Sequence, residues 1–348
     1  MPATVRSLAR SLRLSPATVS NALSGRGRIA PATRQRVQAA AAAAGYRHNP
    51  LAGRLMSELR RSCGSTFHGV LAAVDIEEPG REPHGAFHQE LVRCAHARAL
   101  ELGFGLEQFV VGRDGLTMPR LDRILKSRGI HGLLLLPTWY TPDYSQLDWS
   151  RYAGVYTDYN IQQPALHCVC CNHYRSMLEI LERLMARGYR RPGLFLEEHR
   201  NERLQHRWGA AFLAFQHSHP DIERVPLHIA PEIREEAFTP WFRRFKPDVV
   251  ISHFTAPLDW MENCGALVPA KHGYVCLNLL FKGRPSAGLD LQPGELGARA
   301  TELLIAQLQR NERGLPKWPT VTTSPARWVE GPTVRAAQPA PASPAGGD

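Results

Sequence analysis

The chain has 348 residues, a hydrophobic content of 43% and a formal net charge of +10. This length suits two or three domains, and the apolar fraction is large enough to build a core. No run reaches the roughly 18 consecutive apolar residues of a membrane helix, so no membrane span is expected. The first residues lack the apolar centre of a signal peptide, which favours a cytoplasmic protein.

The positive charge is concentrated in residues 1–62. This segment has eleven Arg, no Lys and a single carboxylate, Glu58, whereas the remaining 286 residues have 31 basic and 31 acidic groups. A basic N-terminal segment on a neutral body indicates a polyanionic partner for that segment only.

The same basic segment has the spacing of three short helices. Thr4 is a candidate N-cap for the first, and Ser15 caps a second that starts at Pro16. A third starts at Pro31 and ends at Gly45. The pattern predicts a helix-turn-helix domain over residues 1–45. The alternative is a solvated three-helix bundle with an accidental excess of charge.

The basic segment has a characteristic set of spaced residues: Ala9, Leu14, Ser15, Thr18, Val19, Ser20, Leu23, Pro31, Thr33, Arg34, Val37, Gly45, Tyr46, Asn49, Pro50, Leu51 and Ala52. At these positions residues 4–57 resemble the DNA-binding head of the LacI/GalR family of transcription regulators. The resemblance combines many spaced positions with the predicted helices, which makes it specific.

The resemblance implies roles for individual residues on DNA. Pro16, Ala17 and Asn21 fall where the family reads base edges in the major groove. A second group falls where the family contacts the phosphate backbone: Ser15, Thr18, Ser20, Ser24, Thr33 and Asn49. The expected DNA-binding set also includes Thr4, Val5, Arg28, Tyr46 and Ala52.

Residues 46–62 match the hinge helix and linker of the family. The resemblance implies that Leu55 wedges into a base step of the minor groove and kinks the DNA. Three residues depart from the family pattern: Gly53 replaces a longer polar residue, Arg13 stands where Gly is usual at the turn, and His48 replaces a common Pro.

From residue 66 onward, apolar strands alternate with helices. Strands are predicted at 67–76, 106–111, 131–137, 152–158, 166–171, 192–197, 224–230, 248–252 and 275–279, and helices at 87–102, 118–128, 174–187, 207–217, 235–245 and 294–309. Repeated βα units predict parallel sheets covered by helices. The resemblance implies two Rossmann-like subdomains of the periplasmic-binding-protein type over residues 63–332. Residues 333–348 are expected to form a disordered tail.

A small-molecule effector is expected between these two subdomains. Arg207 falls where the family places an effector-binding arginine, and a guanidinium suits either hydroxyls or a carboxylate. Asp158 and Asn278 lie at the ends of predicted strands, where ligand sites of parallel sheets are found. Asn278 replaces a usual Asp, and His253 lies where Asn-Asp is usual, which weakens the prediction of a sugar. Trp139 either stacks on the ligand or packs in a core or interface.

Cys168, Cys170 and Cys171 form a cluster within a predicted strand. Strand alternation places the first two on one face and the third on the other. No pair has the C-x-x-C spacing of a tetrahedral metal site, so buried reduced thiols are favoured over a metal. No catalytic or phosphate-loop motif is found, and neither an enzyme nor a cofactor is expected.

These observations predict a homodimeric, effector-controlled repressor that binds a near-palindromic DNA operator. The effector is expected to be a sugar or a related metabolite. Two alternatives remain open at this stage: an architectural DNA-binding protein with a degenerate cleft, and a small-molecule binding protein without a regulatory role.

Overall fold

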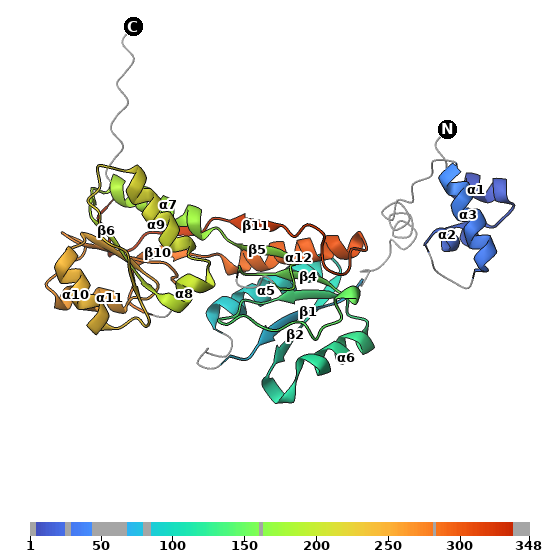
Figure 1. Ribbon diagram of the computed structural model, residues 1–348, viewed down its shortest axis with the longest axis horizontal. Coiled ribbons are helices and arrows are strands. Elements are labelled where there is room, and N and C mark those ends of the chain that lie inside the picture. The colour runs from blue at the N-terminus through green and yellow to red at the C-terminus, as the bar shows by residue number, and fades with distance from the viewer. Residues whose placement is uncertain are drawn as a thin grey trace, which may run out of the picture. The chain divides into compact units, whose positions relative to one another are not determined.

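The computed structural model describes residues 5–24, 29–43, 68–78, 85–159, 163–280 and 283–336. The chain divides into two compact units, residues 1–66 and 67–348. Each unit is described by itself, and Figure 1 labels their helices and strands. The predicted hinge residues 46–62 lie outside the described part of the chain. Within that part, no helix combines the length and apolar character needed to cross a membrane.

Three short helices make up the described part of the first unit. They are α1 (Val5–Leu12), α2 (Pro16–Ser24) and α3 (Pro31–Ala43). Their small core consists of Leu8, Ala9, Val19, Ala22, Val37 and Ala41. In α2 and α3 these residues are three or four positions apart and in α1 they are adjacent, so each helix buries one apolar face.

The turn between α1 and α2 is held by local hydrogen bonds. The Ser15 hydroxyl accepts a hydrogen bond from the Thr18 backbone N–H at 3.0 Å, as expected of an N-cap. The Leu14 N–H donates to the Ala9 carbonyl at 2.9 Å and closes the end of α1. Arg13, in the turn between the two helices, has a φ of 53°. A non-glycine residue in this conformation costs roughly 1–2 kcal/mol.

The second unit contains two six-stranded sheets. The first has the strand order β11-β5-β4-β3-β1-β2, and all its neighbouring strands are parallel. Its strands and the helices that cover it are β1 (Gly69–Ile76), α5 (Ala86–Glu101), β2 (Phe104–Val111), α6 (Met118–Arg128), β3 (Gly132–Leu135), β4 (Ala153–Tyr156), β5 (His167–Cys171), α12 (Pro293–Gln309) and β11 (Val321–Ser324), with the short 3-10 helices η1 (Arg113–Gly115) and η2 (Trp149–Arg151).

The second sheet has the order β12-β10-β9-β8-β6-β7 and is parallel except for β12, which pairs antiparallel with β10. Its elements are α7 (His173–Ala186), β6 (Pro192–Glu197), α8 (Glu198–Arg203), α9 (Arg207–Ser218), β7 (His228–Ala230), α10 (Glu235–Phe245), β8 (Val249–Ser252), α11 (Ala256–Asn263), β9 (Gly273–Cys276), β10 (Ala287–Asp290) and β12 (Arg327–Val329).

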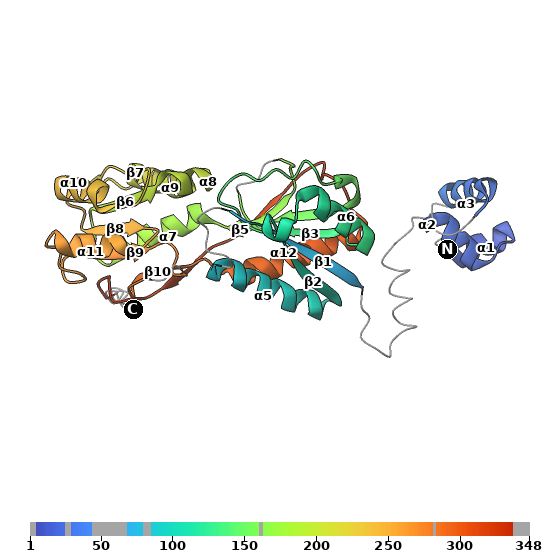
Figure 2. The same ribbon diagram turned by 90° about the horizontal axis from the view of Figure 1, so that it is seen from below.

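The chain crosses between the two sheets three times. It leaves the first sheet after β5, returns through α12 after β10, and leaves again between β11 and β12. Figure 2 shows α5 and α12 together on one side of the first sheet and α6 on the other. Helices therefore cover both faces of that sheet, as the predicted βα units require.

Most predicted elements of the body are present, and three of them, α6, β6 and α10, have the predicted bounds. Two predicted strands differ from the observed ones by three or more residues at one end. The strand predicted at 224–230 is β7, His228–Ala230, and the one predicted at 275–279 is β9, Gly273–Cys276. The strands β10 and β11 and the helices α8 and α11 were not predicted.

The predicted start of the disordered tail at residue 333 was also wrong. Thr333 is buried; its hydroxyl donates to the Tyr274 carbonyl at 2.7 Å and accepts a hydrogen bond from the Ala287 N–H at 2.9 Å. The Arg335 N–H donates to the Tyr189 hydroxyl at 3.0 Å. These contacts attach residues 333–335 to the second sheet, because they satisfy polar groups that are otherwise buried.

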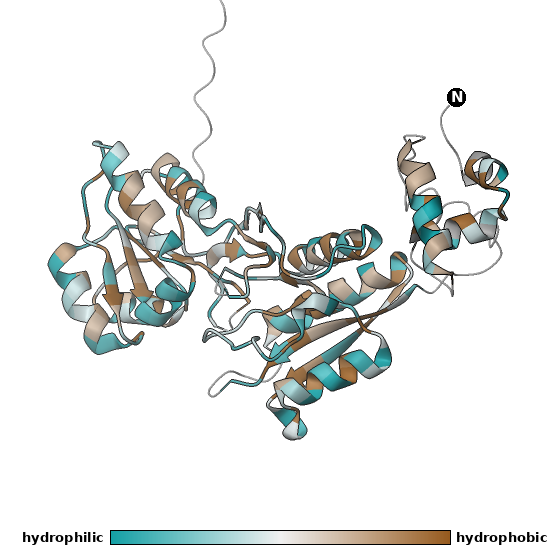
Figure 3. Ribbon diagram, turned by 45° about the vertical axis from the view of Figure 1, so that its right-hand side comes forward, coloured by the Kyte–Doolittle hydropathy of each residue, from teal (hydrophilic) through white to brown (hydrophobic). Residues whose placement is uncertain are grey.

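The core of the body lies along the strands. Figure 3 shows hydrophobic colour along the strands and mixed colour on the helices, which have one buried face each. On α12 this packing is unusually close: a Cβ added at Gly297 would lie 2.2 Å from the Leu91 carbonyl oxygen of α5. Only a glycine therefore permits the observed distance between α5 and α12.

We predict that Gly297→Ala lowers the free energy of unfolding by about 1–3 kcal/mol, because the added methyl group forces the two helices apart. Gly294→Ala is the matched control on the same helix. Its Cβ meets only side-chain atoms of Cys94 and Glu90, which can move. Urea denaturation of both variants measures the difference, and an equally stable Gly297→Ala variant contradicts the prediction.

Candidate effector cleft and DNA-binding residues

The described residues of the predicted DNA-binding set lie on all three N-terminal helices. Val5 begins α1, and Ala17, Ser20 and Ser24 lie within α2. Of the others, Ser15, Pro16 and Asn21 are exposed, and Thr18 and Thr33 are half-buried. Thr4, Arg28, Tyr46, Asn49, Ala52 and Leu55 lie outside the described residues.

The predicted effector residues lie where strands of both sheets end. Trp139 follows β3, Asp158 follows β4, His253 follows β8 and Asn278 follows β9, while Arg207 is the first residue of α9. Asp158, His253 and Asn278 are buried. Loops at the carboxyl ends of parallel strands converge on one edge of a sheet, which is where such folds bind ligands.

The two halves of the body are the parts built on the first and the second sheet. Asp158, in the first half, is joined to the second half by an ion pair that sequence analysis did not predict. Its Oδ2 pairs with the guanidinium of Arg203, at the end of α8. The same guanidinium donates to the Thr138 carbonyl at 3.3 Å, and Asp158 Oδ1 accepts the Tyr159 N–H at 2.7 Å. The side chains are only 7% (Asp158) and 18% (Arg203) exposed, so the bridge is largely shielded from water.

Trp139 forms a second connection between the halves. Its carbonyl accepts a hydrogen bond from His199 Nε2 at 2.8 Å, and the Arg200 guanidinium lies 5.2 Å from the centre of its ring. The Glu78 carboxylate accepts the backbone N–H groups of Trp139 and Tyr140 at 2.8–2.9 Å. These contacts fix the position of the indole ring beside the Arg200 guanidinium.

Arg207 is positioned by neighbours from both halves. Its guanidinium lies 3.9 Å from the centre of the Tyr159 ring and donates to Gln205 Oε1 at 3.0 Å. Gln205 Nε2 in turn donates to the Tyr159 carbonyl at 3.2 Å. Among the described residues, Arg207 has no ion pair with a carboxylate.

Several buried polar atoms near these residues have no hydrogen-bond partner in the described part of the chain. They are the Nε atoms of Arg203 and Arg207, Nε1 of Trp208 and Nδ1 of His253. Buried donors and acceptors in a native protein are nearly always paired. Four such atoms in one cluster of residues are therefore suited to a polar ligand.

Two histidines in the cleft are held neutral. Burial, followed by the charges of Arg203 and Arg207, lowers the pKa of His173 to about 3. Burial, followed by Arg200 and Arg203, lowers the pKa of His253 well below its ordinary value. Their rings pack edge-on against Trp208, with ring centres 4.8 Å from His173 and 6.5 Å from His253. The neutral rings can donate or accept hydrogen bonds without adding charge.

Asn278 serves the loop after β9. Its Oδ1 accepts the Leu280 N–H at 3.1 Å. An Asx-type bond of this kind fixes the local turn. Sequence reasoning identified Asn278 and Asp158 because they follow strands, but it missed Arg203, Tyr159, His173 and Trp208. Only their spatial proximity distinguishes these four residues from ordinary helix and loop residues.

The predicted strand alternation of the cysteines is confirmed for one pair. The sulfur atoms of Cys168 and Cys170 are 3.5 Å apart, and both side chains are buried together with Cys171. Across the described residues, no group of three or more His, Cys, Asp or Glu side chains is placed to hold a metal ion.

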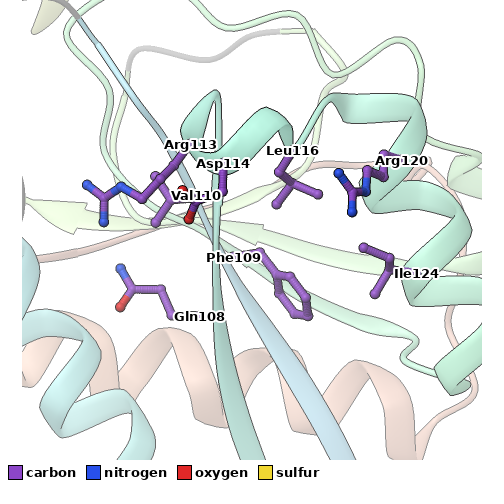
Figure 4. Close-up of a pocket in the computed structure, with 8 residues that line it drawn as sticks. All are labelled: Gln108, Phe109, Val110, Arg113, Asp114, Leu116, Arg120 and Ile124. Carbon is purple, nitrogen blue, oxygen red and sulfur yellow. The ribbon is translucent and has the colours of Figure 1, made fainter.

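A surface pocket lies away from the predicted cleft, beside the edge strand β2. Figure 4 shows its lining on β2, η1 and α6: Gln108, Phe109, Val110, Arg113, Asp114, Leu116, Arg120 and Ile124. None of the predicted effector residues contributes to it.

We predict that acidification destabilises the protein through His173. A histidine whose pKa is depressed on folding stabilises the native state above its unfolded pKa of about 6.5, and this stability is lost as the pH falls towards 3. Between pH 7 and pH 5.5 the loss from this residue is about 1.3 kcal/mol. Urea denaturation at the two pH values measures it.

In His173→Gln, the free energy of unfolding should fall by about 1.3 kcal/mol less than in the wild type between pH 7 and pH 5.5. The matched control His96→Gln, on the exposed surface of α5, should keep the pH dependence of the wild type. An unchanged pH dependence in His173→Gln rules out the assignment.

No protein-family model matches the sequence, and no curated protein matches it. Solved structures do match its fold. A complex of the transcriptional regulator CelR with cellobiose is 19% identical, covers 95% of this chain and 99% of its own, and has a TM-score of 0.57.

Two other solved structures match in the same way. The lac repressor dimer bound to operator and the anti-inducer ONPF is 16% identical over 97% of this chain and all of its own, with a TM-score of 0.54. A LacI-family regulator, CcpA from Weissella paramesenteroides with bound glucose, is 14% identical over 76% of this chain and 98% of its own, with a TM-score of 0.56. The body of this chain therefore has the two-subdomain α/β fold of these regulators.

Proposed function

We propose that the chain is a transcription regulator of the LacI/GalR type, a repressor that binds DNA through residues 1–62 and a small-molecule effector through residues 67–336. The observation that carries this proposal is a cluster of polar and aromatic side chains at the ends of the strands of both sheets. Arginine, aromatic and neutral histidine side chains from both halves of the body meet at the carboxyl ends of its strands. The +10 charge of the N-terminal segment provides the affinity for DNA.

Arg207, Asp158, Trp139, His253 and Asn278 are proposed to line the effector site, together with Arg203. A guanidinium with an unpaired Nε suits the vicinal hydroxyls of a sugar or an acidic group of a related metabolite. The Trp139 ring suits the apolar face of such a molecule. The named ligands of two similar structures, cellobiose and glucose, support this class.

Regulation is proposed to act by linkage between the cleft and the DNA-binding helices of a homodimer. An effector that binds one arrangement of the two halves more tightly shifts the population towards it. If that arrangement also changes the spacing of the paired hinges, the affinity for a near-palindromic operator changes. The coupling is reciprocal, so operator DNA must change effector affinity by the same factor.

The three N-terminal helices are proposed to form a helix-turn-helix head with α2 in the major groove. Pro16, Ala17 and Asn21 are proposed to read bases, and Ser15, Thr18 and Thr33 to contact phosphates. Leu55 is proposed to wedge into the minor groove. The exposure of Pro16 and Asn21 and the cap formed by Ser15 are consistent with these roles.

A second candidate is a DNA-binding protein whose cleft takes no effector. It is favoured by the Asp158–Arg203 bridge, in which the protein's own side chains join the two halves. The following experiment separates the candidates.

A panel of sugars, sugar acids and nucleobases should contain one class that raises the melting temperature and changes the affinity for operator DNA. Arg207→Gln should weaken binding of that ligand by roughly 10- to 150-fold, because it removes a charge-assisted hydrogen bond of about 1.5–3 kcal/mol. The exposed Arg299→Gln on α12 is the matched control. Stabilisation without a change in DNA affinity excludes linkage, and no ligand at all favours the second candidate.

Asn21→Ala should reduce the difference in binding free energy between operator and random DNA by about 1–3 kcal/mol, because a side chain that reads a base edge is lost. Electrophoretic mobility shifts on both DNAs at one salt concentration measure the ratio. Gln38→Ala, on an exposed position of α3, is the control. An equal loss of affinity for both DNAs would show that Asn21 contacts the phosphate backbone and does not read a base.

A further inference from the structure

The Cys168–Cys170 pair lies directly beside the proposed effector residues. The Cys168 S–H donates to the Asp158 carbonyl oxygen at 2.8 Å, and the Cys170 side chain is hydrogen-bonded to that of Tyr159. Tyr159 in turn lies under the Arg207 guanidinium. The two thiols therefore lie behind the proposed effector residues, where Cys168 is 6% exposed and Cys170 2%.

The geometry of the pair suits one atom bound by both sulfurs. With a bond of about 2.3 Å from each sulfur, typical of zinc thiolates, a separation of 3.5 Å gives a sulfur–centre–sulfur angle of about 100°. A linear two-coordinate ion needs the sulfurs about 4.6 Å apart by the same bond length. The sulfur–sulfur separation thus matches a bent centre rather than a linear one.

The pair is less suited to sensing an oxidant. The hydrogen bond with Cys170, followed by burial, raises the pKa of Cys168 well above its ordinary range. Oxidation proceeds through the thiolate, so a buried neutral thiol reacts slowly with a peroxide. A thiophilic centre must displace both protons as well, so its binding strengthens as the pH rises, and the two bonds that it forms to sulfur offset this cost.

We propose that Cys168 and Cys170 form a dithiol site for a small thiophilic centre with bent coordination, trivalent arsenic or a soft divalent metal ion. With an arsenical of the type R–As=O, two arsenic–sulfur bonds form and the arsenic–oxygen bond breaks. The two thiol protons leave with that oxygen as water, and no electrons are transferred. With a divalent ion, two metal–sulfur bonds form and both protons pass to solvent.

Occupation of the site changes the surroundings of Asp158. The S–H that donates to the Asp158 carbonyl is lost when the sulfur binds the new centre. The same residue holds Arg203 through its side chain. The site is therefore connected to the link between the two halves by one residue, without any need for an effector in the cleft.

The full chain should be titrated with phenylarsine oxide, cadmium and silver ions, with mass spectrometry of the intact protein as the readout. One phenylarsine is expected per chain at this site. Cys168→Ser and Cys170→Ser should each weaken its binding on the order of a hundredfold, because the two-point attachment is lost. Cys171→Ser, on the other face of β5, is the matched control and should bind as the wild type does.

Silver, which prefers linear coordination, should bind this pair more weakly than the bent centres. Tighter binding of phenylarsine oxide than of cadmium assigns the site to trivalent arsenic, and the reverse assigns it to a divalent metal. Cys168→Ala and Cys170→Ala, checked by thermal melting, replace the serine variants if these unfold. Equal phenylarsine affinity in the wild type and the folded Cys168 and Cys170 variants overturns the proposal, and so does a wild type that binds none.

Discussion

The cluster of proposed effector residues depends on the ion pair between Asp158 and Arg203. The two residues come from different halves of the body, Asp158 after β4 of the first sheet and Arg203 from α8 beside the second. Burying each charge costs several kcal/mol, and the pair is stable only where further hydrogen bonds satisfy both ions. The Tyr159 N–H and the Thr138 carbonyl supply those bonds.

The positive charges near this pair determine the chemistry of the cleft. Arg200, Arg203 and Arg207 lie close enough to His173 and His253 to oppose their protonation, and burial acts in the same direction. The histidines therefore act as neutral polar groups beside Trp208. A ligand meets a surface of fixed cations, neutral imidazoles and indole rings, in which its own hydroxyl or acidic groups can pair with the unpaired donors.

Much of the fold was predictable because its signals are local. The helix α6 has the predicted bounds since the Thr117 hydroxyl caps its start and Gly129, in the left-handed conformation, ends it. The strand β11 was missed because Val-Thr-Thr-Ser is short and exposed, and only its pairing with β5 makes it a strand. The extent of β9 is likewise set by pairing with β8 rather than by its own apolar run.

Part of the candidate site was also predictable from the sequence. Asp158, His253 and Asn278 follow apolar strands, and this position is visible in the sequence. Arg203 does not follow an apolar strand, so its position gives no sign of a ligand site. It lies at the end of the short helix α8, and Gln205 and His206 both adopt positive φ values in the turn that follows, before α9. Neither residue is a glycine, so the sequence gives no sign of this turn.

Asp158 also explains how events in separate parts of the cleft affect one another. Its carboxylate holds Arg203 of α8 and the Tyr159 N–H, while its carbonyl accepts the Cys168 S–H of β5. Arg207 is placed through Tyr159, the next residue in the chain. A change in any one of these partners must alter the position or the charge environment of the same short segment. Coupling between the two halves therefore requires no long path through the core, because a two-residue segment after β4 contacts the groups that a ligand would move.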